Sequence, residues 1–229
     1  MKKILLAGRS GYIGSYLYDY YYNKENVSSI IRKGNDKEKN IFILDLTNLQ
    51  NVKEFANKAP YFDCLIFLVG LAHSKGKNKE LIEFENINYK TLYNLLNSLN
   101  QKSKLPKKIV FSSSISVYGE KEVSTHYYEN SEKTPYSPYA RTKLQAEKYL
   151  LSNFINNSWI LRFSPVYFHG FKRNIEKRTK IGNFYYKVGD GNLKLSLCNV
   201  ENIITAIDGI LNDKIPVGVY NVSDHIDYS

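Results

Sequence analysis

Tyr139 and Lys143 stand four residues apart in the segment Y-A-R-T-K. Residues 137–154 are predicted to form a long helix, and positions i and i+4 of a helix lie side by side on one face. A cation beside a phenol favours the phenolate and lowers the phenol pKa from about 10 toward neutrality. Tyr139 is therefore a candidate general acid or base. A chain with 20 tyrosines contains such pairs by chance, so the interpretation depends on neighbouring motifs.

A serine-rich segment supplies a third polar group. The apolar residues 108–111 predict a strand, and Ser112, Ser113 and Ser114 follow it directly. Ligands of open parallel sheets bind beyond the carboxyl ends of the strands. We therefore expect the Ser114 hydroxyl to lie beside Tyr139 and to hydrogen-bond a substrate oxygen.

A glycine-rich turn near the start of the chain predicts a nucleotide site. It lies between a predicted strand (residues 4–7) and a predicted helix (residues 14–22). Such glycines allow the backbone to approach a pyrophosphate, which the helix N-terminus attracts. The spacing is G-x-x-G-x-x-G, not the G-x-G-x-x-G of the dehydrogenase fingerprint, and such turns also occur for structural reasons alone; the strand–turn–helix context favours the nucleotide. The residues are Gly8, Arg9, Ser10, Gly11, Tyr12, Ile13 and Gly14.

The end of the second predicted strand, residues 27–31, indicates which dinucleotide binds. NAD-binding folds usually place Asp or Glu there to bind the ribose hydroxyls. Here Arg32 stands at this point, and no carboxylate follows until Asp36. A guanidinium suits a 2′-phosphate, and Arg9 in the turn can add to it. The sequence therefore favours NADP over NAD, the alternative being that Arg32 is a solvated loop charge.

The order of elements predicts the fold class, an α/β protein with a Rossmann-like, doubly wound parallel sheet. We divide the chain into an NAD(P)-binding domain (residues 1–165) and a partial substrate-binding region (residues 166–229). The helix and strand at residues 200–211 and 218–222 are expected to pack back on the Rossmann core. Further strands are predicted at residues 41–44, 64–69 and 159–163, helices at 49–58 and 86–99, a basic loop at 168–180, and short strands near Tyr185 and at 193–197.

Composition excludes several classes of protein. The net charge is +10, but the lysines are scattered and form no basic cluster interleaved with aromatic residues, so nucleic-acid binding is not expected. An anionic cofactor and substrate would tolerate such a surface. No run of about 18 apolar residues predicts a membrane span. The first apolar run ends at Ala7, too early for a signal peptide. Two unpaired cysteines predict neither a disulfide nor a metal site, and the expected compartment is the cytoplasm.

Several ordered segments together resemble the extended short-chain dehydrogenases/reductases, especially the nucleotide-sugar epimerases, dehydratases and reductases. The resemblance covers nearly the whole chain. The segments are the glycine turn, D-L at residues 45–46, S-S-S-I-S-V-Y-G at 112–119, S-P-Y-A-R-T-K at 137–143, L-R-F-S-P-V-Y at 161–167, V-G-D-G at 188–191, V-E-N-I at 200–203 and V-Y-N-V at 219–222.

The resemblance implies roles for further residues. Lys143 would hold the nicotinamide ribose, with Ser114 and Tyr139 as its catalytic partners. His73 would approach the substrate, although a loop histidine without a catalytic duty is an equal alternative. Lys194 stands beside the position where many relatives carry an arginine for the substrate phosphates. The implied cofactor contacts are Asp45 and Leu46 at the adenine, Leu68, Val69 and Gly70 after the fourth strand, and Pro165 and Val166 at the nicotinamide.

The sequence also departs from the family pattern. Phe168, His169 and Gly170 replace the usual Gly-Pro, and the chain stops at Ser229, where such proteins usually continue. Either the protein is a truncated form or its substrate pocket is abbreviated. We expect weak affinity for a nucleotide sugar unless a second subunit of a homodimer covers the site.

The implied activity is reduction of a nucleotide sugar, a UDP-linked 4-keto-6-deoxy-N-acetylhexosamine, for bacterial surface polysaccharide. Arg32 favours this reductase, because net reduction normally consumes exchangeable NADPH. The near alternative is a 4-epimerase with tightly held NAD. The alternative of another class is a non-catalytic regulatory or scaffold protein that binds a dinucleotide on the same fold.

Overall fold

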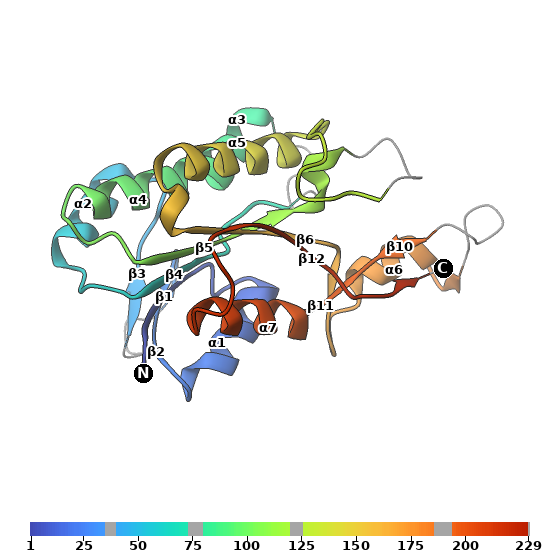
Figure 1. The fold of residues 1–229 in the computed structure, drawn as a ribbon, viewed down its shortest axis with the longest axis horizontal. Helices are drawn as coiled ribbons and strands as arrows, with labels where there is room; N and C mark the ends of the chain where they lie inside the picture. Colours follow the sequence, from blue (N-terminus) through green and yellow to red (C-terminus); the bar gives the residue numbers. More distant parts are fainter. Residues whose placement is uncertain (35–39, 73–79, 120–125, 186–193, 229) are drawn as a thin grey trace.

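The computed structural model describes residues 1–34, 40–72, 80–119, 126–185 and 194–228. At its centre lies a seven-stranded parallel sheet in the order β12-β6-β5-β4-β1-β2-β3 (Figure 1). The order reverses between β1 and β4, so the predicted doubly wound Rossmann-like sheet is confirmed. The strands are β1 (Lys3–Ala7), β2 (Asn26–Ile31), β3 (Ile41–Ile43), β4 (Cys64–Phe67), β5 (Lys108–Ser114), β6 (Ser158–Phe163) and β12 (Gly218–Val222).

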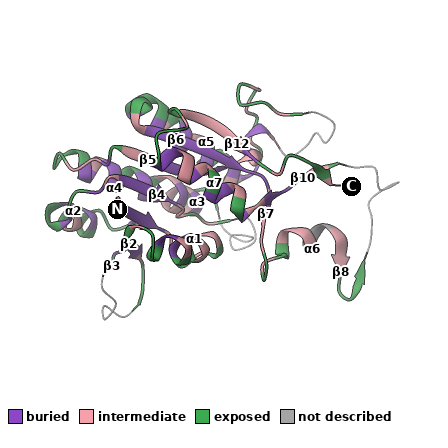
Figure 2. Cartoon of the chain, turned by 60° about the horizontal axis from the view of Figure 1, so that its bottom comes forward, coloured by how far each residue is buried: buried purple, intermediate pink, exposed green. Residues whose placement is uncertain are grey.

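Helices cover both faces of the sheet. Helices α1 (Tyr12–Tyr22) and α7 (Val200–Leu211) lie on one face. The other face carries α2 (Leu49–Lys58), α3 (Leu81–Glu85), α4 (Thr91–Asn100) and α5 (Pro138–Asn153), with a π-helical turn (Asn86–Lys90) between α3 and α4. The five inner strands, β1, β2, β4, β5 and β6, are largely buried (Figure 2), as expected where helices cover both faces of a parallel sheet.

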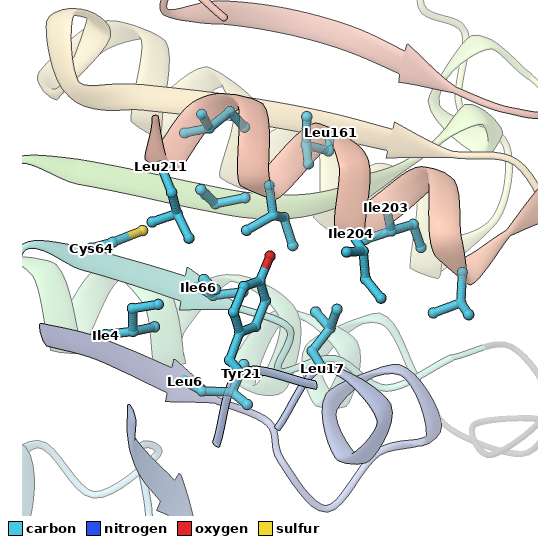
Figure 3. Packing of buried hydrophobic residues seen from close by; sticks show 14 of the residues in the cluster. Ile4, Leu6, Leu17, Tyr21, Cys64, Ile66, Leu161, Ile203, Ile204 and Leu211 are labelled. Atoms are coloured by element: carbon cyan, nitrogen blue, oxygen red, sulfur yellow. The ribbon is translucent and has the colours of Figure 1, made fainter. Parts of the chain in front are cut away.

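The layer formed by α1 and α7 brings together the start and the end of the chain. Leu17 of α1, Ile203 and Ile204 of α7, and Ile4 and Leu6 of β1 belong to one buried cluster (Figure 3). The phenol of Tyr21 crosses this layer and donates a hydrogen bond of 2.8 Å to Asp208 of α7. Strand β12 then pairs in parallel with β6 and forms the edge of the sheet.

Short elements lie beyond the carboxyl ends of the central strands (Figure 1). Strand β7 (Val166–Tyr167) pairs with β11 (Cys198–Asn199), β8 (Lys180–Ile181) with β9 (Phe184–Tyr185), and β10 (Leu195–Ser196) with β13 (Asp227–Tyr228). Helix α6 (Arg173–Thr179) lies among them. The prediction of a basic loop at 168–180 is therefore wrong over this part. The segment R-N-I-E-K-R-T contains one apolar residue, so it carries no amphipathic period to reveal a helix.

Two other predicted boundaries differ from the structure for physical reasons. Strand β5 continues through the serines to Ser114, because Ser112 and Ser113 pair with Leu161 and Arg162 of β6. The helix expected from residue 86 begins earlier, with α3, where Glu80 and Glu83 form a capping box. Within the described residues, no helix is long and apolar enough to cross a membrane.

Candidate active site

The first turns of α5 carry the tyrosine and the lysine. The side chain of Ser137 caps the helix by accepting a hydrogen bond of 3.2 Å from the Ala140 N–H. Tyr139 is half-buried in the first turn, and Lys143 is buried one turn later. The Lys143 ammonium lies 6.0 Å from the centre of the Tyr139 ring. The structure thus brings the two predicted residues together on one face of the helix.

Lys143 is held against the end of the sheet. Its Nζ donates a hydrogen bond of 2.8 Å to the Ser112 carbonyl of β5 and lies 4.8 Å from the centre of the Phe111 ring. Burial lowers the pKa of Lys143 to about 8, and the charge of Glu147, one turn further along α5, opposes this shift. The ammonium is therefore still charged at neutral pH, close to the phenol whose pKa it can lower.

Ser114 is the last residue of β5 and is half-buried. Its hydroxyl accepts a hydrogen bond of 3.2 Å from the Ser116 N–H and caps the 3₁₀ turn Ile115–Tyr118. Both β5 and this turn pack against α5. Ser114 therefore lies two residues beyond the carbonyl that binds Lys143, at the carboxyl end of a central strand.

Asn88 is a site residue that the sequence reasoning missed. It is fully buried in the π-helical turn, where its Oδ1 accepts a hydrogen bond of 2.5 Å from the Leu71 N–H. Its Nδ2 donates to the Thr142 hydroxyl at 3.0 Å and to the Leu71 carbonyl at 3.3 Å. Asn88 thus fastens the segment after β4 to α5 beside Lys143. The available signal was an asparagine one helical turn before Leu92, on the apolar side of a predicted helix.

Gly70 lies between these groups. A Cβ added there would lie 3.2 Å from the Lys143 Nζ and 3.5 Å from the Asn88 Oδ1. Leu68 and Val69, the other residues expected to line the cofactor, are half-buried just after β4.

The glycine turn fits a dinucleotide pyrophosphate. Gly8 has a φ of +100°, and a Cβ on Gly14 would lie 2.1 Å from the Gly8 carbonyl oxygen, so both positions require glycine. Gly11 caps α1 with extended backbone, no side chain caps this helix end, and its first turn contains no acidic residue. This N-terminus therefore meets the requirements of an anion site, which the turn leaves accessible to a phosphate group.

Arg32 and Asp45 lie where the adenosine half of the dinucleotide is predicted to bind. Asp45 accepts hydrogen bonds from the Thr47 N–H at 2.9 Å and the Thr47 hydroxyl at 2.7 Å, which lower the pKa of Asp45. The charge of exposed Arg32 lowers the pKa of Asp45 further, so the two groups are neighbours. Arg9 stacks over the Tyr18 ring at 3.6 Å, which directs its guanidinium along α1.

The remaining predicted residues are spread more widely. Leu46 is buried, and its carbonyl accepts a hydrogen bond from Asn94 at 3.1 Å. Pro165 lies just before β7, whose first residue is Val166, and the Pro165 carbonyl accepts a hydrogen bond of 3.1 Å from the Cys198 N–H. Lys194 is exposed just before β10. His73 lies outside the described residues. Within the described residues, no group of three or more His, Cys, Asp or Glu side chains could hold a metal ion.

A buried ion pair joins β6 to α5, the helix that carries Tyr139 and Lys143. Arg162 of β6 donates to both carboxylate oxygens of Glu147 at 3.0 and 2.7 Å, and to the Tyr118 hydroxyl at 2.7 Å. The Ser113 hydroxyl donates to the same carboxylate. These bonds lock α5 onto β5 and β6. The sequence signal was an arginine inside the apolar run W-I-L-R-F.

The model of the NAD dependent epimerase/dehydratase family matches residues 4–223. No curated protein matches significantly. Among solved structures, the Helicobacter pylori ADP-L-glycero-D-manno-heptose-6-epimerase has a TM-score of 0.76 and 20% identity, over 100% of this chain and 78% of that one. UDP-glucuronic acid 4-epimerase from Bacillus cereus, in complex with NAD, has a TM-score of 0.76 and 23% identity, over 99% of this chain and 78% of that one. L-threonine dehydrogenase from Clostridium difficile has a TM-score of 0.78 and 22% identity, over 100% of this chain and 77% of that one.

At these identities the structural matches show a shared fold, whereas the family match spans all but a few residues at each end of the chain. The chain therefore belongs to the NAD dependent epimerase/dehydratase family of extended short-chain dehydrogenase/reductase enzymes, as its motifs predicted.

Proposed function

We propose that this enzyme uses NADPH to reduce carbon 4 of a nucleotide sugar, a UDP-linked 4-keto-6-deoxy-N-acetylhexosamine, in the synthesis of a bacterial surface polysaccharide. The observation that carries the proposal is the pairing of Tyr139 with the buried, still-charged Lys143 at the carboxyl end of β5. When bound, the nicotinamide would supply the hydride.

The chain's own residues would manage the proton and the charge. The Tyr139 phenol would donate its proton to the sugar oxygen as negative charge develops there, and the Ser114 hydroxyl would hydrogen-bond the same oxygen. Lys143 would stabilise the phenolate that remains. Because Asn88 and the Ser112 carbonyl fix the surroundings of the ammonium, these groups are oriented before the reaction begins.

The proposed preference for NADP rests on Arg32. Its exposed guanidinium stands at the end of β2, where an NAD-specific site would carry a carboxylate. Asp45, the neighbouring acid, is held by two hydrogen bonds from Thr47, which leaves the cationic side chain to meet a 2′-phosphate. An arginine fork suits that dianion better than a lysine would.

The second candidate is a nucleotide-sugar 4-epimerase, because three of the structures that share the fold are 4-epimerases of UDP-sugars. Epimerisation would use Tyr139 first as base and then as acid, with Ser114 hydrogen-bonding the sugar oxygen both times and no net consumption of reduced cofactor.

The test is a turnover screen of the purified protein with NADPH against UDP- and dTDP-linked 4-keto sugars. Oxidation of NADPH in step with sugar reduction is expected with one of them. Interconversion of carbon-4 epimers without net oxidation would identify the epimerase instead. Dinucleotide binding without either reaction would support the third hypothesis, a regulatory or scaffold protein. The Tyr139→Phe variant serves as the control for chemistry at this site.

A further inference from the structure

Residues 168–171 form a tight hairpin directly after β7. The Phe171 N–H donates to the Phe168 carbonyl at 2.9 Å, and the Phe168 N–H donates to the Phe171 carbonyl at 3.2 Å. Gly170, at the exposed tip, has a φ of +82°, which favours glycine in the turn. The hairpin therefore presents two phenylalanine rings from a fixed backbone. This is the segment where Phe168, His169 and Gly170 replace the Gly-Pro of related sequences.

These rings stack on the first turns of α1. The Phe171 ring lies 4.3 Å from the Tyr12 ring, nearly parallel to it, and the Phe168 ring lies 5.0 Å from the Tyr16 ring. The two phenylalanines are 5.2 Å apart, so four aromatic rings form a continuous ladder. Tyr12 and Tyr16 occupy positions i and i+4 and therefore project from one face of the helix. We call the hairpin with its ladder the aromatic strap.

The strap lies beside the end of α1 that fits a pyrophosphate. Tyr12 is the first residue of α1 and follows Gly11 of the glycine turn. The strap itself starts after Pro165 and Val166, which the family motifs assign to the nicotinamide end. The chain from residue 165 to 171 thus runs from the expected nicotinamide position back to the expected pyrophosphate position. Figure 2 shows this segment between β7 and α6, with its exposed tip.

The strap has both the space and the weak attachment that opening requires. A cavity of about 460 Å³ lies beside it, lined by Tyr12, Glu176 and residues 169–173. Aromatic stacking adds only a modest free energy beyond the apolar area it buries. Phe171 and Tyr12 lie outside the buried core, whereas Phe168 and Tyr16 pack against it, so the tip of the hairpin can separate from Tyr12 while Phe168 stays in place.

We infer that the aromatic strap controls the release of the dinucleotide, so that Phe171 and Tyr12 set the residence time of the cofactor. The inference rests on the dinucleotide site of the proposed function, but not on the identity of the sugar. Stacking of Phe171 on Tyr12 blocks the path away from the glycine turn, and separation of the rings opens it. A reductase must exchange its cofactor in every cycle, so the gate would set the rate of that exchange.

The experiment measures the dissociation rate of NADPH from the full-length protein by stopped-flow fluorescence, with excess NADP⁺ as the competitor. Phe171→Ala is expected to accelerate dissociation about two- to tenfold, the range that one aromatic pair supports. Phe184→Ala is the matched control, because Phe184 is an equally sized exposed ring on β9, outside the ladder. It should leave the rate unchanged.

A double-mutant cycle identifies the contact itself. Tyr12→Ala should accelerate release as Phe171→Ala does, and the double variant should be no faster than the faster single variant, because the contact is already lost. Gly170→Ala keeps both rings and strains the hairpin, so it should accelerate release as well.

Wild-type dissociation rates in Phe171→Ala, or an equal effect in Phe184→Ala, would overturn the inference. Failure of the proposed function looks different, because the strap variants would still change NADPH release while no nucleotide sugar is turned over. Absence of any NADPH binding would refute both.

Discussion

Lys143 holds a positive charge inside the protein, and this has an energetic cost. Its pKa falls from 10.5 to about 8, so at neutral pH the folded state binds this proton less tightly than the unfolded chain does. Because the unfolded state binds more protons between pH 8 and 10, the contribution of Lys143 to stability rises as the pH rises through this range. We expect Lys143→Met to raise the free energy of unfolding by about 1–3 kcal/mol at pH 7, with a smaller gain at pH 10.

Urea denaturation of both proteins at the two pH values measures this difference. Lys148→Met, at an exposed position of the same helix, should change stability little at either pH. A Lys143→Met variant less stable than the wild type at pH 7 would contradict the assignment of a destabilising charge. A variant that is more stable but inactive would show that Lys143 is kept for function at a cost in stability.

Tyr139 makes a separate prediction, because only its hydroxyl takes part in the proposed reaction. Tyr139→Phe should lower turnover of the true substrate by about 10²–10⁴-fold, the usual contribution of a general acid, while NADPH binds with unchanged affinity. Steady-state kinetics and calorimetry measure the two effects. A near-normal rate in the variant would show that another group supplies the proton.

Arg32 is expected to select the cofactor. A charge-assisted contact with a 2′-phosphate contributes roughly 1.5–3 kcal/mol, so Arg32→Ala should weaken NADPH binding by about tenfold or more and leave NADH binding little changed. Lys53→Ala removes the same charge from an exposed site on α2 and should affect neither cofactor. Equal losses for the two cofactors would exclude Arg32 as the selecting residue.

Among the elements, helices α2 and α7 have lysine side chains bound to their C-terminal carbonyls. The Lys104 Nζ donates to three carbonyls at the C-terminus of α2, those of Ala56, Asn57 and Ala59, at 3.1, 2.9 and 2.7 Å. Lys108 makes the same kind of contact at the end of α7, with the Ile210 carbonyl at 2.5 Å. A cation there satisfies carbonyls that the helix leaves unpaired and interacts favourably with its dipole.

Lys104 should therefore stabilise the fold measurably. Lys104→Met retains most of the side-chain length and loses the charge, and we expect a decrease of about 1–2 kcal/mol in the free energy of unfolding. Thermal or urea unfolding measures it, with Lys102→Met, at an exposed neighbouring position, as the control. Equal stability of the two variants would mean that the cap contributes nothing beyond a solvated charge.

How far the sequence predicts an element depends on whether its apolar residues repeat. Helix α2 (Leu49–Lys58) and helix α7 (Val200–Leu211) were predicted to the residue, since both have a clear apolar stripe. Helix α6 has almost none and was missed. The π-helical turn around Asn88 was also missed, because its extra residue is dictated by the contacts of a buried amide and leaves no trace in periodicity.

The candidate site was predictable to a similar degree. Motif spacing located Ser114, Tyr139, Lys143 and the glycine turn. The contacts that hold them could not be read from the sequence, because Asn88, Thr142 and Leu71 meet only when distant segments fold together. The strap contact between Tyr12 and Phe171 joins residues 159 positions apart, and no local pattern encodes it.

At the scale of the whole molecule, the net charge is +10, and the structure assigns roles to four of the cationic side chains. Lys104 and Lys108 serve helix ends, Lys143 serves the site, and Arg162 serves a buried carboxylate. A net positive charge is compatible with the anionic cofactor and substrate of the proposed function.

The buried cluster shared by β1, α1 and α7 has a consequence for how the protein folds. It joins Ile4 and Leu6 to Ile203 and Ile204, so this part of the core is complete only after residues some two hundred positions later in the chain have been synthesised. Contacts between such distant segments form slowly, because a long loop must close before they contribute. Until then, the nascent chain exposes an apolar face of the sheet, the kind of surface that chaperones bind and that promotes aggregation.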